Sequence, residues 1–246
     1  MYVLTIDQRG STHDVDRVPE LLRALGSHYG VRFERSVGDE VQGVLQDPAL
    51  VVDVALHTLR SGHWYVGIGV GPGTLPPEAS PREGSGPAFV AARRAVERAK
   101  SAASHVPAAV VAGSSDSEAA AACANAEAVL RLVGRLVQDR TEAQWRVVDA
   151  LRAKSGARSG QGPGRHGLQK QVAGELGISE QSVSRAVLRS GWQEEWAARP
   201  AVESLLAAAH RLILGNLMPE NPSPGNTSPG NPGSGKRDGD NNRGEP

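Results

Sequence analysis

The side chains best suited to recognise another molecule lie in the stretch QKQVAGELGISEQSVSRAVLR at 169–189. Amide, hydroxyl and guanidinium groups at helical spacing can hydrogen-bond to base edges in the major groove of DNA. The candidates for base contacts are Gln181, Ser184 and Arg185, with Ser182 beside them. Cations position a protein on DNA by binding phosphates, and the candidates for that role are Lys170, Arg189, Arg158 and Arg165.

Two short helices joined by a turn would hold these groups. Apolar residues recur at helical spacing on both sides of the turn, as Val172, Ala173 and Leu176, then Val183, Ala186 and Val187. Gly177 lies where the turn needs a left-handed backbone, which glycine adopts without strain. Ser179 can cap the second helix. The pattern predicts a helix-turn-helix that binds double-stranded DNA, and the alternative is a helical hairpin that only packs.

A second group of chemically interesting residues lies near the start of the chain. Asp7 ends a short apolar strand, and Asp39 lies at the tip of a predicted hairpin. Two carboxylates at neighbouring strand ends suit a divalent cation and a nucleotide phosphate. The turn QRGST after Asp7, which contains Gly10, has backbone amides that could cradle phosphate. The alternative is that Asp7 only caps a turn at the end of its strand and that Asp39 is an ordinary hairpin residue.

Alternating strand and helix signals must position these two carboxylates. The sequence predicts strands at 2–6, 31–37, 41–46, 63–70 and 106–113, and helices at 14–29, 48–61 and 87–103. The order βαββαβαβ predicts an α/β sandwich with helices on one face of a mixed sheet. We expect a linker helix at 116–140, an all-α helix-turn-helix domain at 141–215 and a disordered tail at 216–246.

Composition limits the class of protein. With 246 residues and 39% hydrophobic residues, the chain can bury a core, although aromatic residues make up only 4%. The absence of a long apolar run predicts no membrane span, and the first residues lack a secretion leader, so we expect a cytoplasmic protein. The single Cys123 excludes an internal disulfide. Acidic residues exceed basic ones before residue 120, and the reverse holds from 140 to 199, which is compatible with DNA binding by the second half.

The first part of the chain resembles a known enzyme family. The stretches LTIDQRGST, RSVGDEVQGVL, VGIGVG and GPAFVAARRAVERAK are similar in order and spacing to class III nucleotidyl cyclase domains. That fold, a ferredoxin-like sandwich, is shared with GGDEF diguanylate cyclases and the polymerase palm. The resemblance covers residues 1–113. It implies that Asp7 and Asp39 bind Mg²⁺ or Mn²⁺, that Arg35 contacts the base, and that Arg93 stabilises the transition state.

The departures from the cyclase pattern concern the catalytic groups. Phe89 stands where cyclases have an asparagine, four residues before Arg93. Arg35 stands where they have a lysine, and its planar guanidinium binds with a different geometry from a lysine ammonium group. We therefore expect a dimerising domain that has lost turnover. It either senses a nucleotide or cyclic nucleotide, with Arg35, Arg93 and Gly10 as its contacts, or serves only as a dimerising scaffold. A metal-dependent cyclase is the alternative.

The second part also resembles known modules. The stretches RTEAQWRVVDAL and GWQEEW on either side of the helix-turn-helix are similar to region four of sigma factors and to MarR-like regulators, and the whole layout resembles actinobacterial SatD-like regulators. Together the two resemblances imply a homodimeric transcriptional regulator with a catalytically degenerate cyclase-like domain. An enzyme and a protein-binding adaptor remain the alternatives.

Overall fold

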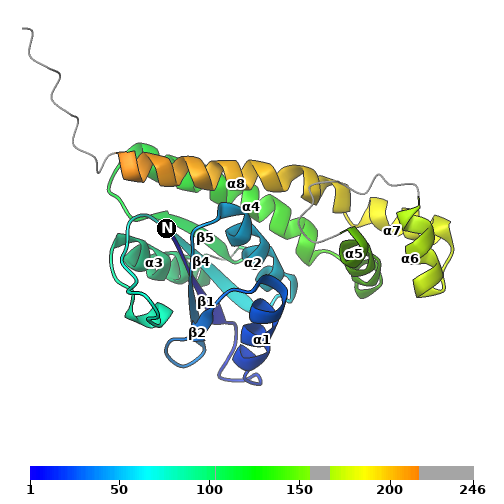
Figure 1. The fold of residues 1–246 in the computed structure, drawn as a ribbon, viewed down its shortest axis with the longest axis horizontal. Coiled ribbons are helices and arrows are strands. Elements are labelled where there is room, and N and C mark those ends of the chain that lie inside the picture. The colour runs from blue at the N-terminus through cyan, green and yellow to red at the C-terminus, as the bar shows by residue number, and fades with distance from the viewer. Residues whose placement is uncertain (103, 156–166, 216–246) are drawn as a thin grey trace, which may run out of the picture.

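The computed structural model describes residues 1–102, 104–155 and 167–215, and these contain one five-stranded sheet (Figure 1). The strands are β1 (Tyr2–Gln8), β2 (Phe33–Arg35), β3 (Glu40–Leu45), β4 (Trp64–Val70) and β5 (Ala108–Ala112). Their order across the sheet is β2-β3-β1-β4-β5. Strand β5 runs parallel to β4, and the other neighbouring pairs are antiparallel. The predicted mixed sheet in an α/β fold is thus confirmed.

Eight α-helices and one 3₁₀ turn accompany this sheet in the described ranges. They are α1 (Val18–Tyr29), α2 (Pro48–Arg60), η1 (Pro81–Glu83), α3 (Pro87–Ser101), α4 (Ser117–Gln138), α5 (Glu142–Ser155), α6 (Leu168–Leu176), α7 (Glu180–Arg189) and α8 (Trp192–Gly215). Side-chain caps begin α2 and α4, where Asp47 and Asp116 accept backbone N–H bonds at 2.9 and 2.7 Å. The predicted tail at 216–246 lies outside the described residues.

The larger core lies on the face of the sheet that carries α1, α2, α4 and α8. Alternate residues of β1, namely Tyr2, Leu4 and Ile6, point into it, because successive side chains of a strand face opposite sides. Helices α4 and α8 run side by side over this face (Figure 1). The core continues along α8 from Ile213 to Trp192, so the closing helix shares its apolar face with the sheet and with the helices at the far end.

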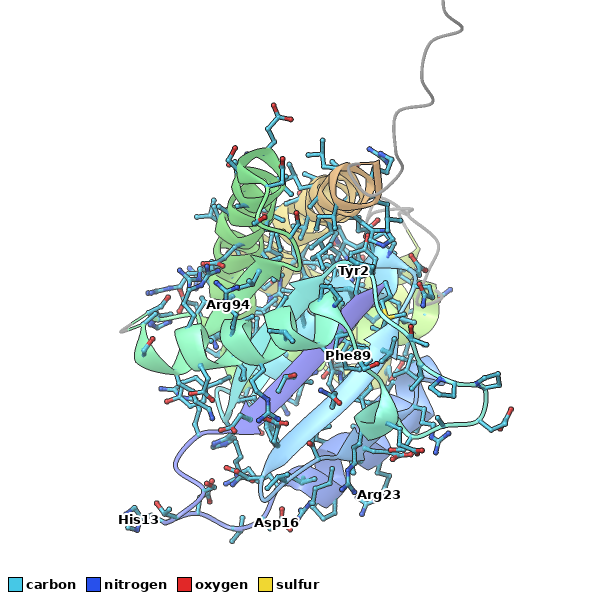
Figure 2. The ribbon with its side chains drawn as sticks, turned by 90° about the vertical axis from the view of Figure 1, so that its left-hand side faces the viewer. Tyr2, His13, Asp16, Arg23, Phe89 and Arg94 are labelled. Carbon is cyan, nitrogen blue, oxygen red and sulfur yellow. The ribbon has the colours of Figure 1, made fainter. Side chains whose placement is uncertain are left out.

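The opposite face of the sheet, called here the α3 face, is covered by α3 (Figure 2). The prediction that helices occupy only one face is therefore wrong. The physical reason lies in β4, where Gly67 and Gly69 have no side chains and α3 packs directly on the strand. A Cβ at Gly69 would overlap the backbone of Ala88 and Ala92, and one at Gly67 would overlap that of Val96.

Helices α5, α6 and α7 pack against one another at one end of the long helix α8 (Figure 1). A buried ionic cluster joins them to the rest of the molecule. The carboxylate of Glu195 on α8 lies 2.6 Å from Arg140, 2.6 Å from Arg152 and 2.7 Å from Arg199. Arg199 also contacts Asp53 of α2. We call these five residues the ionic junction.

A second link runs from α2 to α5. Arg60 donates two hydrogen bonds to Asp149 at 2.8 and 2.7 Å, and its guanidinium lies 3.7 Å from the ring centroid of Trp145. These contacts fix the orientation of α5 relative to the sheet. In the part of the chain that the structure describes, each helix is too short or too polar to span a membrane.

Candidate nucleic-acid interface and the charged face of the sheet

Helices α6 and α7 are joined by the turn that the sequence predicts. Gly177 adopts φ 64° and ψ 32°, the left-handed conformation, and its N–H bonds to the carbonyl oxygen of Ala173. The hydroxyl of Ser179 accepts a hydrogen bond from the backbone N–H of Ser182 at 3.1 Å. The left-handed glycine and the serine cap are both confirmed, and they set the direction in which α7 leaves the turn.

The two helices bury one face and expose the other. Val172, Ala173, Val183 and Val187 are buried in the shared core. The exposed side chains of α7 and its surroundings include most of the predicted DNA contacts, namely Lys170, Gln181, Ser184, Arg185 and Arg189. The structure therefore leaves these five residues exposed to solvent, whereas Arg158 and Arg165 lie outside the described residues.

Two residues of α7 differ from what the sequence pattern indicates. Ser182 is half-buried, and its hydroxyl lies 2.9 Å from that of Ser179, so it belongs to the helix cap. The sequence pattern did not single out Leu188 as a candidate contact, although this residue is 72% exposed. The helical repeat could have found it, because Leu188 stands seven residues after Gln181 and on the side opposite to Val183.

The predicted acidic site contains a lysine. Asp7 is buried in β1, and in the ladder it pairs with Glu40 of β3, so two carboxylates lie side by side on the α3 face. Lys100 on α3 places its Nζ 2.8 Å from Asp7, and Arg93 lies 3.2 Å from Glu40. Arg93 and Lys100 are seven residues apart, which places both on one side of α3.

The electrostatics of Asp7 follow from this arrangement. Burial raises the pKa of the Asp7 carboxyl, the hydrogen bond and charge of Lys100 oppose this, and the nearby charges of Asp39 and Glu40 raise it further. Asp39 is thus close enough to act on Asp7, but the buried ladder partner is Glu40. Sequence reasoning missed Glu40 and Lys100, because only the strand register shows which acidic residue faces α3.

A metal ion does not fit this cluster well. The Nζ of Lys100 already supplies a positive charge to Asp7. Among the described residues, there is no group of three or more His, Cys, Asp or Glu side chains placed to hold a metal. Divalent cations require several oxygen ligands, and the carboxylates of Asp7 and Glu40 already have cationic partners. The assignment of Asp7 and Asp39 as metal ligands stays a prediction.

The predicted nucleotide contacts Arg35 and Arg93 lie on opposite faces of the sheet. Arg35 lies on the sheet face opposite to Glu40 and Arg93, because it pairs with Val41 in the ladder. Its guanidinium is bound to Asp16 at 2.5 Å. Arg93 is consequently the predicted contact that remains on the α3 face.

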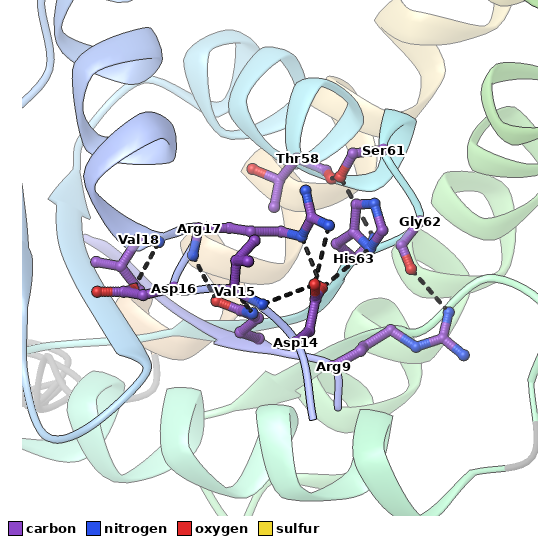
Figure 3. Close-up of polar contacts among 11 residues, drawn as sticks. Arg9, Asp14, Val15, Asp16, Arg17, Val18, Thr58, Ser61, Gly62 and His63 are labelled. Carbon is purple, nitrogen blue, oxygen red and sulfur yellow. Dashed lines mark hydrogen bonds and ion pairs between the residues drawn. The ribbon is translucent and has the colours of Figure 1, made fainter. Parts of the chain in front are cut away.

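The turn after β1 is organised by its own side chains. Gly10 has φ 66°, as a tight turn requires. Beyond it, Asp14 accepts hydrogen bonds from Arg17 at 2.7 and 3.1 Å and from the N–H of Val15 at 2.8 Å, and His63 lies 4.0 Å away (Figure 3). Asp14 and Arg17 thus satisfy each other's charge within this turn, and the phosphate cradle at Gly10 stays a prediction.

A hollow of about 430 Å³ opens beside the N-terminal end of α3, and we call it the arginine pocket. Its charged and polar lining consists of Ser36, Gln42, Arg82, Ser85, Arg93 and Arg94. Phe89 forms an apolar wall and packs with Val3 and Ala92 (Figure 2). Three guanidinium groups around one hollow favour an anionic ligand.

Comparison with known proteins gives no family. No protein-family model, curated protein or solved structure matches this chain. The likenesses to nucleotidyl cyclases and to sigma-type modules therefore stay predictions from the motifs.

Proposed function

We propose that this protein is a sequence-specific regulator of transcription that inserts α7 into the major groove of double-stranded DNA. The observation that carries the proposal is the outer face of α7, which exposes Gln181, Ser184 and Arg185 on a helix oriented by Gly177 and Ser179. An exposed helix with an amide, a hydroxyl and a guanidinium at these spacings matches the donor and acceptor pattern of base edges.

The charges around α7 support the same proposal. Arg185, Arg189 and Lys170 are exposed, whereas Glu175, on the preceding helix, is paired with Lys154 at 2.8 Å. Glu180 lies in the first turn of α7, where it interacts favourably with the helix dipole. Lys170 and Arg189 would hold phosphates while Arg185 reads a base.

The α/β half, a ferredoxin-like domain in this proposal, would pair two chains and bind a phosphorylated small molecule, such as a nucleotide, in the arginine pocket. The pocket supports an anion, and the Lys100–Asp7 ion pair supports binding without Mg²⁺ or Mn²⁺. A two-fold dimer would present two copies of α7 to half-sites about 34 Å apart. The alternative is a cyclase that uses Asp7 and Asp39. It would be supported if the protein formed a cyclic product from ATP or GTP in the presence of Mn²⁺ and if the variant Asp39→Ala did not.

Two substitutions test the DNA contact. Duplexes enriched by the wild-type protein from a random pool would be titrated with Arg185→Ala and Lys170→Ala by fluorescence anisotropy. Arg185→Ala should lose about 1–3 kcal/mol of discrimination between the enriched duplex and a scrambled one. Lys170→Ala should weaken binding to both duplexes alike and should reduce the slope of the log binding constant against log salt concentration by about one.

The result that would refute this assignment is wild-type affinity and preference in both variants. Failure to bind any duplex would favour the alternative of an adaptor, in which the helix pair contacts a protein.

A further inference from the structure

One large apolar side chain, Leu188, is exposed on α7 beside the proposed base contacts. At 100° per residue, Leu188 lies within about 20° of Gln181 and between Ser184 and Arg185 around the helix, whereas Arg185 points most directly away from the buried residues Val183 and Val187. Leu188 is 72% exposed. It therefore lies on the same ridge as the proposed base contacts and does not belong to the core.

The surroundings of Leu188 indicate what it would meet. The exposed cations Arg185 and Arg189 lie within three residues of it, and they favour a polyanionic partner over an apolar protein surface. In the major groove of DNA, the apolar group on the base edges is the C5-methyl of thymine. A leucine that faces this groove can bury its methyl groups there and gain the free energy of removing apolar surface from water.

We propose that Leu188 packs against the C5-methyl group of a thymine and so determines one position of the recognised sequence. This inference rests on the proposed binding of DNA by α7. Arg185 and Gln181, about one and two turns earlier on the same ridge, would read neighbouring base pairs by hydrogen bonds. Leu188 is then a specificity-determining residue, and its contribution depends on a single methyl group.

Replacement of thymine by deoxyuridine removes that methyl group and leaves the Watson–Crick pairing intact. In the duplex enriched by the wild-type protein, each thymine would be replaced in turn, and affinities would be measured by fluorescence anisotropy. At one position in each half-site, deoxyuridine should weaken wild-type binding about three- to fivefold, the effect of one buried methyl group. Leu188→Ala should bind the thymine and deoxyuridine duplexes equally.

Two further variants complete the comparison. Leu188→Met keeps an apolar side chain of similar volume and should retain the preference for thymine. Leu132→Ala removes a leucine that is 70% exposed on α4, and it should behave as wild type. Because Leu188 is exposed, its substitutions should leave thermal unfolding unchanged.

The outcomes separate the two proposals. A folded wild-type protein that enriches no sequence overturns DNA recognition by α7, and with it the role of Leu188. An enriched sequence that lacks thymine, or that tolerates deoxyuridine everywhere, overturns the role of Leu188 alone. Equal sensitivity of wild type and Leu188→Ala to deoxyuridine also overturns it, because another side chain would then contact the methyl group.

Discussion

At the scale of single residues, the α3 face is defined by charges that compensate one another. Asp7 and Glu40 are neighbours in the sheet and both are buried, so their repulsion must be offset. Lys100 and Arg93 supply the opposing charges from α3. This arrangement explains how two adjacent carboxylates can be stable in a buried part of the sheet.

The substitution Lys100→Met tests this account. It should lower the free energy of unfolding by about 1–3 kcal/mol at neutral pH, because Asp7 would keep its burial and lose its hydrogen-bonded partner. The pKa of Asp7 is already raised, and the loss of Lys100 would raise it further. Because the pKa of Asp7 is higher in the folded state than in the unfolded state, its contribution to stability is present below the unfolded-state pKa. That contribution is lost as pH rises through the folded-state pKa.

Denaturant unfolding at pH 4 and at pH 7.5 would measure this difference, and the loss caused by Lys100→Met should be larger at pH 7.5. Lys154→Met is the matched control, because its partner Glu175 is exposed and such pairs contribute about 0–1 kcal/mol. A loss that is the same at both pH values would show that the ion pair with Asp7 is not its cause.

At the scale of elements, the turn between α6 and α7 can be tested with two identical changes of opposite effect. Gly177→Ala should destabilise the protein by about 1–2 kcal/mol, because Gly177 is left-handed and a Cβ is unfavourable in that conformation. Gly174→Ala lies within α6 with open space around its Cα, and it should stabilise by about 0.5–1 kcal/mol. Thermal unfolding of the two variants measures both effects.

Destabilisation by both alanines would contradict the helical placement of Gly174, and neutrality of Gly177→Ala would contradict the tight turn. If the turn also orients α7, Gly177→Ala should weaken DNA binding at a temperature where the protein is still folded.

The elements were largely predictable where local signals are strong. The apolar spacing around Val172 and Val183, the glycine at 177 and the cap at Ser179 each act within a few residues, and the structure has them as predicted. The start of α1 differs from the prediction. The helix begins at Val18, whose N–H donates a hydrogen bond to Asp16, while Asp14 accepts one from Val15 in the preceding turn.

The faces of the sheet could not be derived in the same way. A shift of one residue in register moves every side chain to the other face, and the sequence alone does not show that Asp7 is paired with Glu40. Gly67 and Gly69 look like weak strand residues, yet they allow α3 to pack on the sheet. Long-range pairing and close approach of backbones are decided by tertiary structure.

At the scale of the whole molecule, the ionic junction connects the sheet to the helices that carry α7. Glu195 and Arg140 have fully buried side chains, and Arg199 reaches across to Asp53 on α2. Burial raises the pKa of Glu195, but the charges of its arginine partners hold that pKa below its usual range. These contacts join α2 to α5 and α8, and Arg140 also donates a hydrogen bond at 2.8 Å to the carbonyl oxygen of Ser190, directly after α7.

The substitution Glu195→Gln removes the shared negative charge and should cost about 3–5 kcal/mol at neutral pH, because buried arginines lose their partner. The pKa of Glu195 is lowered, so its contribution is present above pH 4.5 and is lost as pH falls through the folded-state pKa. The deficit of the variant should therefore shrink in acid. Denaturant unfolding measures it, with the exposed neighbour Glu194→Gln as a near-neutral control.

Equal stabilities of the Glu195 and Glu194 variants at neutral pH would contradict the role of the junction. A variant that loses the fixed packing of α5–α7 while the sheet stays folded would instead support it as the connection between the two parts.

The central claim, that α7 recognises a DNA sequence, is tested most directly by selection from a pool of random duplexes with the folded wild-type protein. Sequencing of the bound fraction should reveal one recurring motif, and in a dimer two half-sites about one helical turn apart. A bound fraction with the same base composition and word frequencies as the starting pool would contradict the claim.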